Sequence, residues 1–385
     1  MKKRNTDKML IGIDGNEANI EKKVGVNQYA YALLKNIYHL QEKSKPIRFV
    51  VYLKNKPRED LPKQKYWWKY KVISGRGLWI ITKLMPHLFL TKDKPDVFFT
   101  PSHYLPPASP MPKVSTIHDL GYLKFSGQFK KYDFWQLTIW TAISVFVSKA
   151  IIAVSNSTKR DIVRHYPFAS KKIAVVHHGY DQKRFNQKIS PKDVRRIKKR
   201  YSIVNDYVLF IGTLKPSKNI EGLLTAWKIV LGKFPKLKLV IAGKKGWLYQ
   251  SIFEKVDQLG LKESVIFTDF IPEGDKPALI AGAKVFVLPS FWEGFGMDVI
   301  NAMACGTPAV VSKLASLPEV AGPAGVYLNP NKIESIAQAI IKVFDMNEVK
   351  YDDLVKRGLK QAKKFSWQEA ARATLATIVA AGSKK

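Results

Sequence analysis

Residues 285–311, VFVLPSFWEGFGMDVINAMACGTPAVV, constrain the fold of this chain more than any other stretch. The stretch holds two short apolar runs, at 285–288 and 309–311, each long enough to form a buried strand. Between the two runs, residues 298–304 place Val299, Ala302 and Met303 on one helical face, and the Gly-x-Pro sequence at 306–308 then ends the helix. This order predicts a βαβ unit of a parallel sheet.

The loop between the first strand and the helix, residues 290–296, indicates a ligand site. Gly294 and Gly296 flank Phe295 just before the helix, and glycines allow backbone N–H groups to approach an anion where a helix begins. Glu293 in the same loop would repel a bare phosphate, because like charges repel. A carboxylate does suit the hydroxyls of a sugar, which need a hydrogen-bond acceptor. The loop therefore predicts a nucleotide-sugar site.

The remainder of the chain repeats the alternation of strand and helix in two halves. A length of 385 residues indicates two domains rather than one. An apolar run at 9–14, a glycine loop and a helical pattern open a first Rossmann-like half, and the apolar run at 207–212 restarts the alternation. The first loop lacks the Gly-x-Gly-x-x-Gly pattern, so we predict no NAD site. We therefore expect an α/β fold of two Rossmann-like domains.

The signature stretch also resembles the corresponding loop of retaining glycosyltransferases of family 4, through Glu293-Gly294-Phe295-Gly296 and Ala302-Met303-Ala304-x-Gly306-x-Pro308. The resemblance implies the GT-B architecture, in which two Rossmann-like domains face a central cleft. It also implies that Glu293 contacts the transferred sugar and that the second position of a Glu-x7-Glu motif contacts the nucleotide ribose. That second position is Asn301 here, a neutral group that can donate and accept hydrogen bonds. Asp298, one turn earlier, could compensate for the missing carboxylate.

Further site residues follow from the same resemblance. His118, in a Thr-x-His-Asp-Leu pattern after a strand, matches the histidine that lies close to the reacting sugar. Lys218 matches a cation that stabilises the departing diphosphate. The family's neighbouring arginine is replaced by Ser217, and Thr213 stands where many relatives carry a second cation. The remaining donor-binding positions that the resemblance implies are Gly25, Thr213, Gly243, Ile271, Gly294, Phe295, Gly296 and Asn301.

The basic stretch after residue 182 and the restart of the alternation at 207 set the expected domain limits, and the resemblance implies that the last helix crosses back to the first domain. Residues 1–182 form an N-terminal Rossmann-like acceptor domain, which the C-terminal helix at 366–380 joins. Residues 183–204 are a basic connector, and residues 205–365 form the C-terminal nucleotide-sugar domain. In the final helix, Ser366 and Glu369 fit a capping box.

The charge of the chain is strongly uneven. The formal net charge is +33, and residues 1–200 hold 40 basic against 14 acidic side chains, a net of +26. Basic surfaces attract nucleic acid, anionic membranes or anionic substrates. The single cysteine, Cys305, provides no disulfide framework and fits a reducing compartment. The N-terminal residues lack the apolar core of a signal peptide, and no apolar run is long enough to span a membrane.

Residues 63–90 interleave aromatic and basic side chains, including Trp67, Trp68 and Trp79. One interpretation is an interfacial membrane segment, with its rings at the headgroup level and its cations on anionic lipid. An ordinary amphipathic helix that caps the sheet explains the pattern equally well, and a surface for single-stranded nucleic acid is a third alternative.

The resemblance, taken with these patterns, implies a retaining glycosyltransferase that moves a hexose from a nucleoside-diphosphate sugar to a hydroxyl of a lipid-linked or glycan acceptor. The chain contains no Asp-x-Asp element, so we expect no metal and no cofactor beyond the donor itself. We expect a cytoplasmic enzyme, peripheral on the inner face of the cell membrane, rather than a nucleic-acid partner. The alternatives are an epimerase or phosphorylase of the same fold, a DNA glucosyltransferase, and a basic nucleic-acid- or membrane-binding protein with weak or lost transferase activity.

Overall fold

The computed structural model of the protein describes residues 9–42, 47–128, 131–246 and 248–383, and it divides into two compact units. The first unit contains residues up to 123, residues 131–179 and the C-terminal stretch from 366. The second unit contains residues 124–130 and 180–365. Each unit is built on its own parallel sheet.

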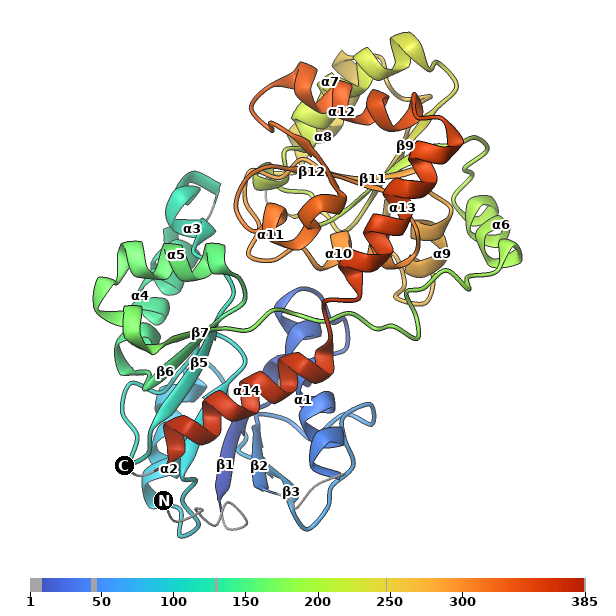
Figure 1. The fold of residues 1–385 in the computed structure, drawn as a ribbon. Helices are drawn as coiled ribbons and strands as arrows, with labels where there is room; N and C mark the ends of the chain where they lie inside the picture. The colour runs from blue at the N-terminus through green and yellow to red at the C-terminus, as the bar shows by residue number, and fades with distance from the viewer. Residues whose placement is uncertain (1–8, 43–46, 129–130, 247, 384–385) are drawn as a thin grey trace. The chain divides into compact units, whose positions relative to one another are not determined.

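The described residues of the first unit form a seven-stranded sheet in the order β3-β2-β1-β4-β5-β6-β7, and every pairing is parallel (Figure 1). The central strands are buried on both faces, which explains why they appear in the sequence as uninterrupted apolar runs. The strands are β1 (Leu10–Asp14), β2 (Arg48–Leu53), β3 (Trp68–Val72), β4 (Val97–Thr100), β5 (Lys113–Ile117), β6 (Ala150–Ala153) and β7 (Ile173–Val175).

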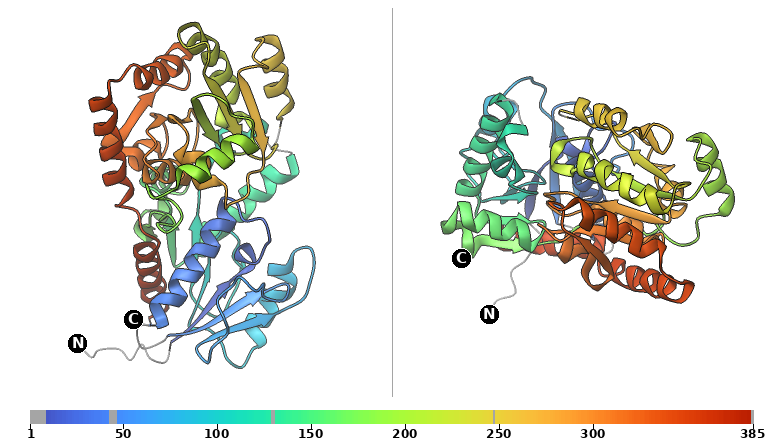
Figure 2. Two further views of the ribbon diagram at one scale, coloured as in Figure 1. Left: turned by 90° about the vertical axis from the view of Figure 1, so that its right-hand side faces the viewer. Right: turned by 90° about the horizontal axis from the view of Figure 1, so that it is seen from above.

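Helices cover both faces of the first sheet. α1 packs against the C-terminal helix α14, and the two lie side by side in Figure 1 and in the left view of Figure 2. α4 and α5 share a core cluster over β5 and β6. Ser155 begins α5 by accepting a hydrogen bond from the backbone N–H of Thr158, at 3.0 Å. The helices are α1 (Val26–Glu42), α2 (Met85–Leu90), α3 (Gly121–Lys124), α4 (Lys131–Val147), α5 (Asn156–His165) and α14 (Trp367–Gly382), with a π-helical turn, η3 (Ile80–Leu84), leading into α2.

Only half of the predicted capping box forms at the start of α14. The Ser366 hydroxyl accepts hydrogen bonds from the backbone N–H groups of Gln368 and Glu369. The Glu369 carboxylate pairs instead with Arg372, one turn further along the helix.

The tryptophans of residues 63–90 do not lie at the surface. Trp67, Trp68 and Trp79 are 4%, 0% and 1% exposed, so their rings belong to the hydrophobic core. Trp68 begins β3, which pairs with β2, and Trp79 packs with Leu84 in the core cluster around Phe98. The interpretation of this segment as interfacial is therefore wrong for these three tryptophans. In the described residues, no helix is both long enough and apolar enough to cross a bilayer.

The second unit repeats the same plan. Its described residues form a six-stranded parallel sheet in the order β10-β9-β8-β11-β12-β13. The strands are β8 (Tyr207–Ile211), β9 (Lys238–Ala242), β10 (Val265–Asp269), β11 (Val285–Leu288), β12 (Ala309–Ser312) and β13 (Gly325–Leu328). The helices are α6 (Pro191–Arg200), α7 (Ile220–Lys233), α8 (Gln250–Gln258), α9 (Lys276–Ala281), α10 (Met297–Ala304), α11 (Leu317–Ala321), α12 (Ile333–Phe344) and α13 (Glu348–Ala362).

The basic stretch that was expected to act as a connector folds with the second unit. Its helix, α6, packs on α9. Arg196 and Arg200 of α6 pair with the buried carboxylate of Asp275, at 3.2 and 2.6 Å. Asp275 thus neutralises part of the positive charge of α6 and ties this helix to the second unit.

Candidate functional site

The strand order of the second unit reverses between β8 and β11, which makes this point the topological switch point of its sheet. In open parallel sheets, ligands bind outside the carboxyl ends of the strands at such a point. The loop after β8 carries Lys218 in a short 3-10 turn, η6 (Pro216–Lys218), and the loop after β11 carries Glu293. The geometry of these two loops therefore defines the candidate site.

An ion pair joins the two loops. The Lys218 ammonium donates to Glu293 Oε1 at 2.5 Å, and the Ser290 hydroxyl donates to the same oxygen at 2.7 Å. Both charged side chains are mostly enclosed, with 16% of Lys218 and 11% of Glu293 exposed. Glu293 Oε2 and two of the three Lys218 N–H groups have no protein partner within the part of the chain that the structure describes. The pair thus offers a ligand both an acceptor and a cation.

Backbone and amide contacts hold the two loops together. The N–H of Phe291 donates to the carbonyl of Ser217 at 2.9 Å. Asn219 adopts a left-handed conformation with φ of 55°, and its side-chain amide donates to the carbonyls of Pro289 and Pro330, at 3.3 and 2.8 Å. The separation of Lys218 from Glu293 is therefore set by the fold rather than by the two flexible side chains alone.

The glycine loop ends where α10 begins. Gly296 precedes the helix with φ of +102°, a conformation that side chains other than glycine rarely adopt. The Ser316 hydroxyl contacts the carbonyls of Glu293 and Phe295, each at 2.9 Å. The Phe295 ring is 4% exposed and packs edge-on against Phe365. The side chain of Phe295 thus belongs to the packed interior rather than to a ligand-facing surface.

Asn301 belongs to a polar cluster on the first turns of α10. Its amide donates to Asp298 Oδ1 at 3.1 Å, and the Lys276 ammonium contacts the same carboxylate oxygen at 3.1 Å. Burial alone would lower the pKa of Lys276, but the carboxylates of Asp298 and Glu273 outweigh burial and raise this pKa. Lys276 therefore stays protonated and fixes Asp298. The carboxylate that position 301 lacks lies one turn earlier and is held in place.

Thr213 and Gly243 lie where the loops after β8 and β9 meet. The N–H of Gly212 donates to the carbonyl of Ala242 at 2.9 Å, and Gly243 has φ of +149°. A Cβ atom at Gly243 would lie 2.0 Å from the carbonyl oxygen of Gly212, so the close approach of these two loops requires a glycine there. Ile271, after β10, is 5% exposed, so its side chain lies in the core.

In the first unit, His118 follows β5 at the carboxyl edge of the sheet. Its Nε2 lies 2.9 Å from the carbonyl oxygen of Pro101, and its ring meets Tyr29 edge-on with centroids 4.7 Å apart. Burial lowers the pKa of His118, and the proximity of the Pro101 carbonyl and of Asp119 offsets only part of this effect. The imidazole is therefore neutral at pH 7, and Nδ1 is its other hydrogen-bonding atom.

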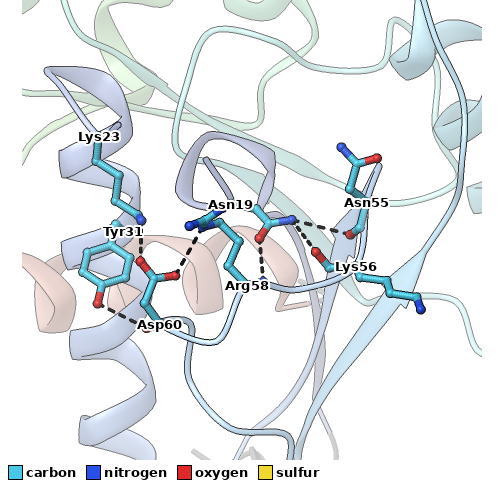
Figure 3. Close-up of polar contacts among 7 residues, drawn as sticks. All are labelled: Asn19, Lys23, Tyr31, Asn55, Lys56, Arg58 and Asp60. Atoms are coloured by element: carbon cyan, nitrogen blue, oxygen red, sulfur yellow. Dashed lines mark hydrogen bonds and ion pairs between the residues drawn. The ribbon is translucent and has the colours of Figure 1, made fainter. Parts of the chain in front are cut away.

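Gly25 lies at the end of the loop between β1 and α1, with φ of +52° and open space around its Cα. This loop is tied to the loop after β2 at two places, which Figure 3 shows. Asn19 bonds the backbone of Lys56 and of Arg58, at 3.0 and 2.9 Å. Lys23 pairs with Asp60 at 2.5 Å. The loop that leads to Gly25 is thus fixed at two points to the loop after β2.

Two family models match the chain. The model described as Glycosyltransferase Family 4 matches residues 43–184, and the model described as Glycosyl transferases group 1 matches residues 193–361. The chain is also 30% identical over 282 residues to the O-antigen chain mannosyltransferase B of Escherichia coli, across 72% of this chain and 73% of the relative. The chain belongs to glycosyltransferase family 4.

Solved structures agree with this assignment at the level of the fold. Sucrose-phosphate synthase from Thermosynechococcus elongatus is similar with a TM-score of 0.76 and 18% identity, covering 98% of this glycosyltransferase and all of that chain. The Anabaena protein HepE, solved in complex with UDP and glucose, is similar with a TM-score of 0.73 and 17% identity, covering 97% of this chain and all of that one. Both likenesses show the GT-B fold of two Rossmann-like domains.

The structure of this glycosyltransferase brings Lys218 into direct contact with Glu293, and it places Asn301 and the Gly294–Gly296 backbone on the segment that follows Glu293. His118 and Gly25 belong to the other unit. Sequence reasoning missed Ser290, Ser316 and Lys276. Ser290 lies three residues before Glu293, a spacing that could have marked it as a local partner. Ser316 and Lys276 lie outside the signature stretch and carry no comparable signal.

Proposed function

We propose that this protein is a retaining, metal-independent glycosyltransferase that moves a hexose from a nucleoside-diphosphate sugar to a hydroxyl of a lipid-linked or glycan acceptor. The observation that carries the proposal is the Lys218–Glu293 pair at the switch point of the second unit. A carboxylate oxygen without a protein partner in the described residues suits sugar hydroxyls, and an ammonium with unused donors suits a diphosphate.

In the proposed reaction, the bond between the sugar C1 and the β-phosphate oxygen breaks and a bond from C1 to the acceptor oxygen forms. The nucleoside diphosphate leaves with the electrons of the broken bond, and its β-phosphate oxygen takes the proton that the acceptor hydroxyl loses. Lys218 would stabilise the negative charge that develops on the leaving group, a task for which no metal is invoked. Glu293 would hold the sugar hydroxyls, and Asp298 with Asn301 would hold the ribose. His118 remains the predicted contact of the transferred sugar in the first unit.

The name of the Escherichia coli relative supports mannose as the hexose and a growing O-antigen-like glycan as the acceptor. The net charge of +26 over residues 1–200 supports an anionic or lipid-linked acceptor at a membrane face. The thermal-shift screen described next identifies the nucleotide base of the donor.

A thermal-shift screen of UDP, GDP, ADP, dTDP and CMP at millimolar concentration tests donor binding. A ligand at about 100 times its Kd adds about 2.7 kcal/mol to stability, which is a visible rise in Tm. We expect one diphosphate to stabilise the protein, equally with and without a chelator of divalent cations. The anomeric configuration of the product, read by NMR, then tests retention. A rise in Tm that disappears with the chelator would refute metal independence.

Asn301, Ser217 and Thr213 favour one specific alternative, a basic binding protein of the same fold with weak or lost transfer. The double variant Asn301→Glu with Ser217→Arg restores the family pattern at two of these positions. We expect donor affinity to change less than about threefold, because Asp298 already supplies a fixed carboxylate. A gain of a hundredfold in turnover would instead show that the natural chain is the weakened member.

A further inference from the structure

The outer side of α4 is more apolar than a solvent-facing helix surface should be. Four large apolar side chains are exposed along it: Tyr132 by 74%, Trp135 by 59%, Ile139 by 53% and Phe146 by 74%. No charged residue occurs between Phe134 and Val147. Large apolar side chains exposed together along one helix are typical of an interaction site rather than of an ordinary surface.

These four residues lie on one side of the helix. The steps from 132 to 135, from 135 to 139 and from 139 to 146 are three, four and seven residues, which return to the same face at 3.6 residues per turn. The opposite face, which packs on the sheet, buries Trp140 and Val145 together with the polar Thr141 and Ser144. The polarity of α4 is thus partly inverted, with polar groups on the inside and aromatic groups on the outside.

A neighbouring turn extends the stripe. Phe168, in the 3-10 helix η5 (Pro167–Lys172), is 58% exposed, and its ring contacts that of Phe146 with centroids 6.1 Å apart. We name Tyr132, Trp135, Ile139, Phe146 and Phe168 the α4 face. Exposed lysines lie at its margins: Lys131 and Lys149 at the two ends of α4, and Lys171 beside Phe168. The exposed acid on α4 is Asp133.

We propose that the α4 face docks the enzyme on a bilayer surface that contains anionic lipid. The proposal deepens the membrane-face action proposed above, on which it rests, by assigning the surface responsible. Tyrosine and tryptophan prefer the headgroup level of a bilayer, and phenylalanine and isoleucine enter the acyl boundary. The marginal lysines then lie at the height of the lipid phosphates, where basic side chains add to binding.

The charge of the protein selects the bilayer over a second copy of the chain. Two copies that meet through their α4 faces would bring together molecules with a net charge of +33 each, and like charges oppose association. An anionic bilayer instead gains from the same charge. The aromatic rings are spread along a helix rather than set in a groove, which suits a flat partner.

Flotation with vesicles tests the proposal, using the full chain at low salt and vesicles either of phosphatidylcholine alone or with phosphatidylglycerol. We expect the natural protein to bind the anionic vesicles. We expect the double variant Trp135→Ser with Phe146→Ser to bind them at least about tenfold more weakly. The matched control is Tyr66→Ser with Leu90→Ser, which removes two exposed apolar side chains (75% and 82%) from the segment first considered as interfacial. We expect this control to bind like the natural protein.

Three results would overturn the proposal. The first is equal binding by the α4 double variant, and the second is loss of binding in the control variant alone. The third is a dimer in light scattering that only the α4 double variant abolishes, which would assign the face to a second copy. The thermal shift with the stabilising nucleoside diphosphate should be the same in all variants. If no diphosphate shifts the natural protein while vesicle binding still depends on the α4 face, the proposed transfer fails and the docking stands.

Discussion

Replacing Glu293 by glutamine should separate binding of the diphosphate from transfer of the sugar. Glutamine retains an oxygen that can accept from Ser290 and Lys218, but it removes the negative charge. Lys218 pairs with Glu293, so in the proposed function Glu293 and a bound diphosphate would compete for its ammonium group. We therefore expect Glu293→Gln to bind a bare nucleoside diphosphate more tightly than the natural protein does.

The size of the expected change in Kd follows from how far the Lys218–Glu293 ion pair is buried. Exposed ion pairs contribute up to about 1 kcal/mol, and breaking a buried pair costs about 3–5 kcal/mol. Lys218 and Glu293 are 16% and 11% exposed, and solvent still screens the pair. We therefore expect removal of the Glu293 charge to improve the binding free energy of the bare diphosphate by about 1 kcal/mol, which is roughly a fivefold lower Kd. Turnover with the sugar nucleotide should fall about a hundredfold, because the charged contact to the sugar is lost.

Isothermal titration with the diphosphate and a turnover assay with the sugar nucleotide measure the two effects separately. Ser290→Ala is the matched control: it removes one hydrogen bond to Glu293 and keeps the charge, so the diphosphate Kd should stay within about twofold. If Glu293→Gln instead weakens diphosphate binding more than threefold, the two side chains act as one structural unit and the competition argument is wrong.

Three further predictions concern stability. Gly243→Ala should lower the free energy of unfolding in urea by about 3 kcal/mol, because its Cβ would lie 2.0 Å from a backbone carbonyl oxygen, whereas Gly232→Ala, whose Cβ meets nothing within 4 Å, should change it by less than about 1 kcal/mol. Burial holds the pKa of His178 well below its ordinary 6.5, so the contribution of His178 to stability should be complete above pH 6.5. Below pH 6.5 the unfolded chain takes up this proton, and His178 alone should steepen the loss of stability by up to about 1.4 kcal/mol per pH unit, in addition to the other buried histidines such as His118. An unchanged slope in His178→Phe would contradict this. Asp275→Ala removes the buried partner of two half-exposed arginines of α6 and should cost about 1–3 kcal/mol in the same urea titration, against less than about 0.5 kcal/mol for Asp257→Ala at an exposed pair.

Both parallel sheets could be predicted from the sequence because strands buried on two faces give unbroken apolar runs. The runs at 207–212 and 285–288 appear as β8 and β11, and the helix expected at 298–304 begins one residue earlier. Local patterns also marked Lys218 and Glu293 individually. Their direct contact spans 75 positions and depends on β8 lying beside β11, which is a property of the sheet order rather than of either loop.

Burial at the ends of elements could not be predicted in the same way. The aromatic and basic residues of 63–90 fit a surface segment and a core segment equally, and only the pairing of β3 with β2 decides that Trp68 is buried while Lys69 and Lys71 are exposed. The sequence of α4 has no charged residue from 134 to 147 and has apolar side chains all around the helix, so it gives no indication of which face lies against the sheet.

The return of α14 to the first unit has a consequence for synthesis on the ribosome. The first unit needs this last helix, whose Ala371, Thr374 and Ile378 are buried and which packs along α1. The second unit, apart from residues 124–130, is the continuous stretch 180–365 and is translated before α14. At about 5–20 residues per second, the surface of the first unit that α14 covers therefore stays uncovered for roughly 10–40 seconds. The N-terminal half of this protein is the first to emerge and the last to be completed, so it is the part that most needs protection from aggregation while the chain is being made.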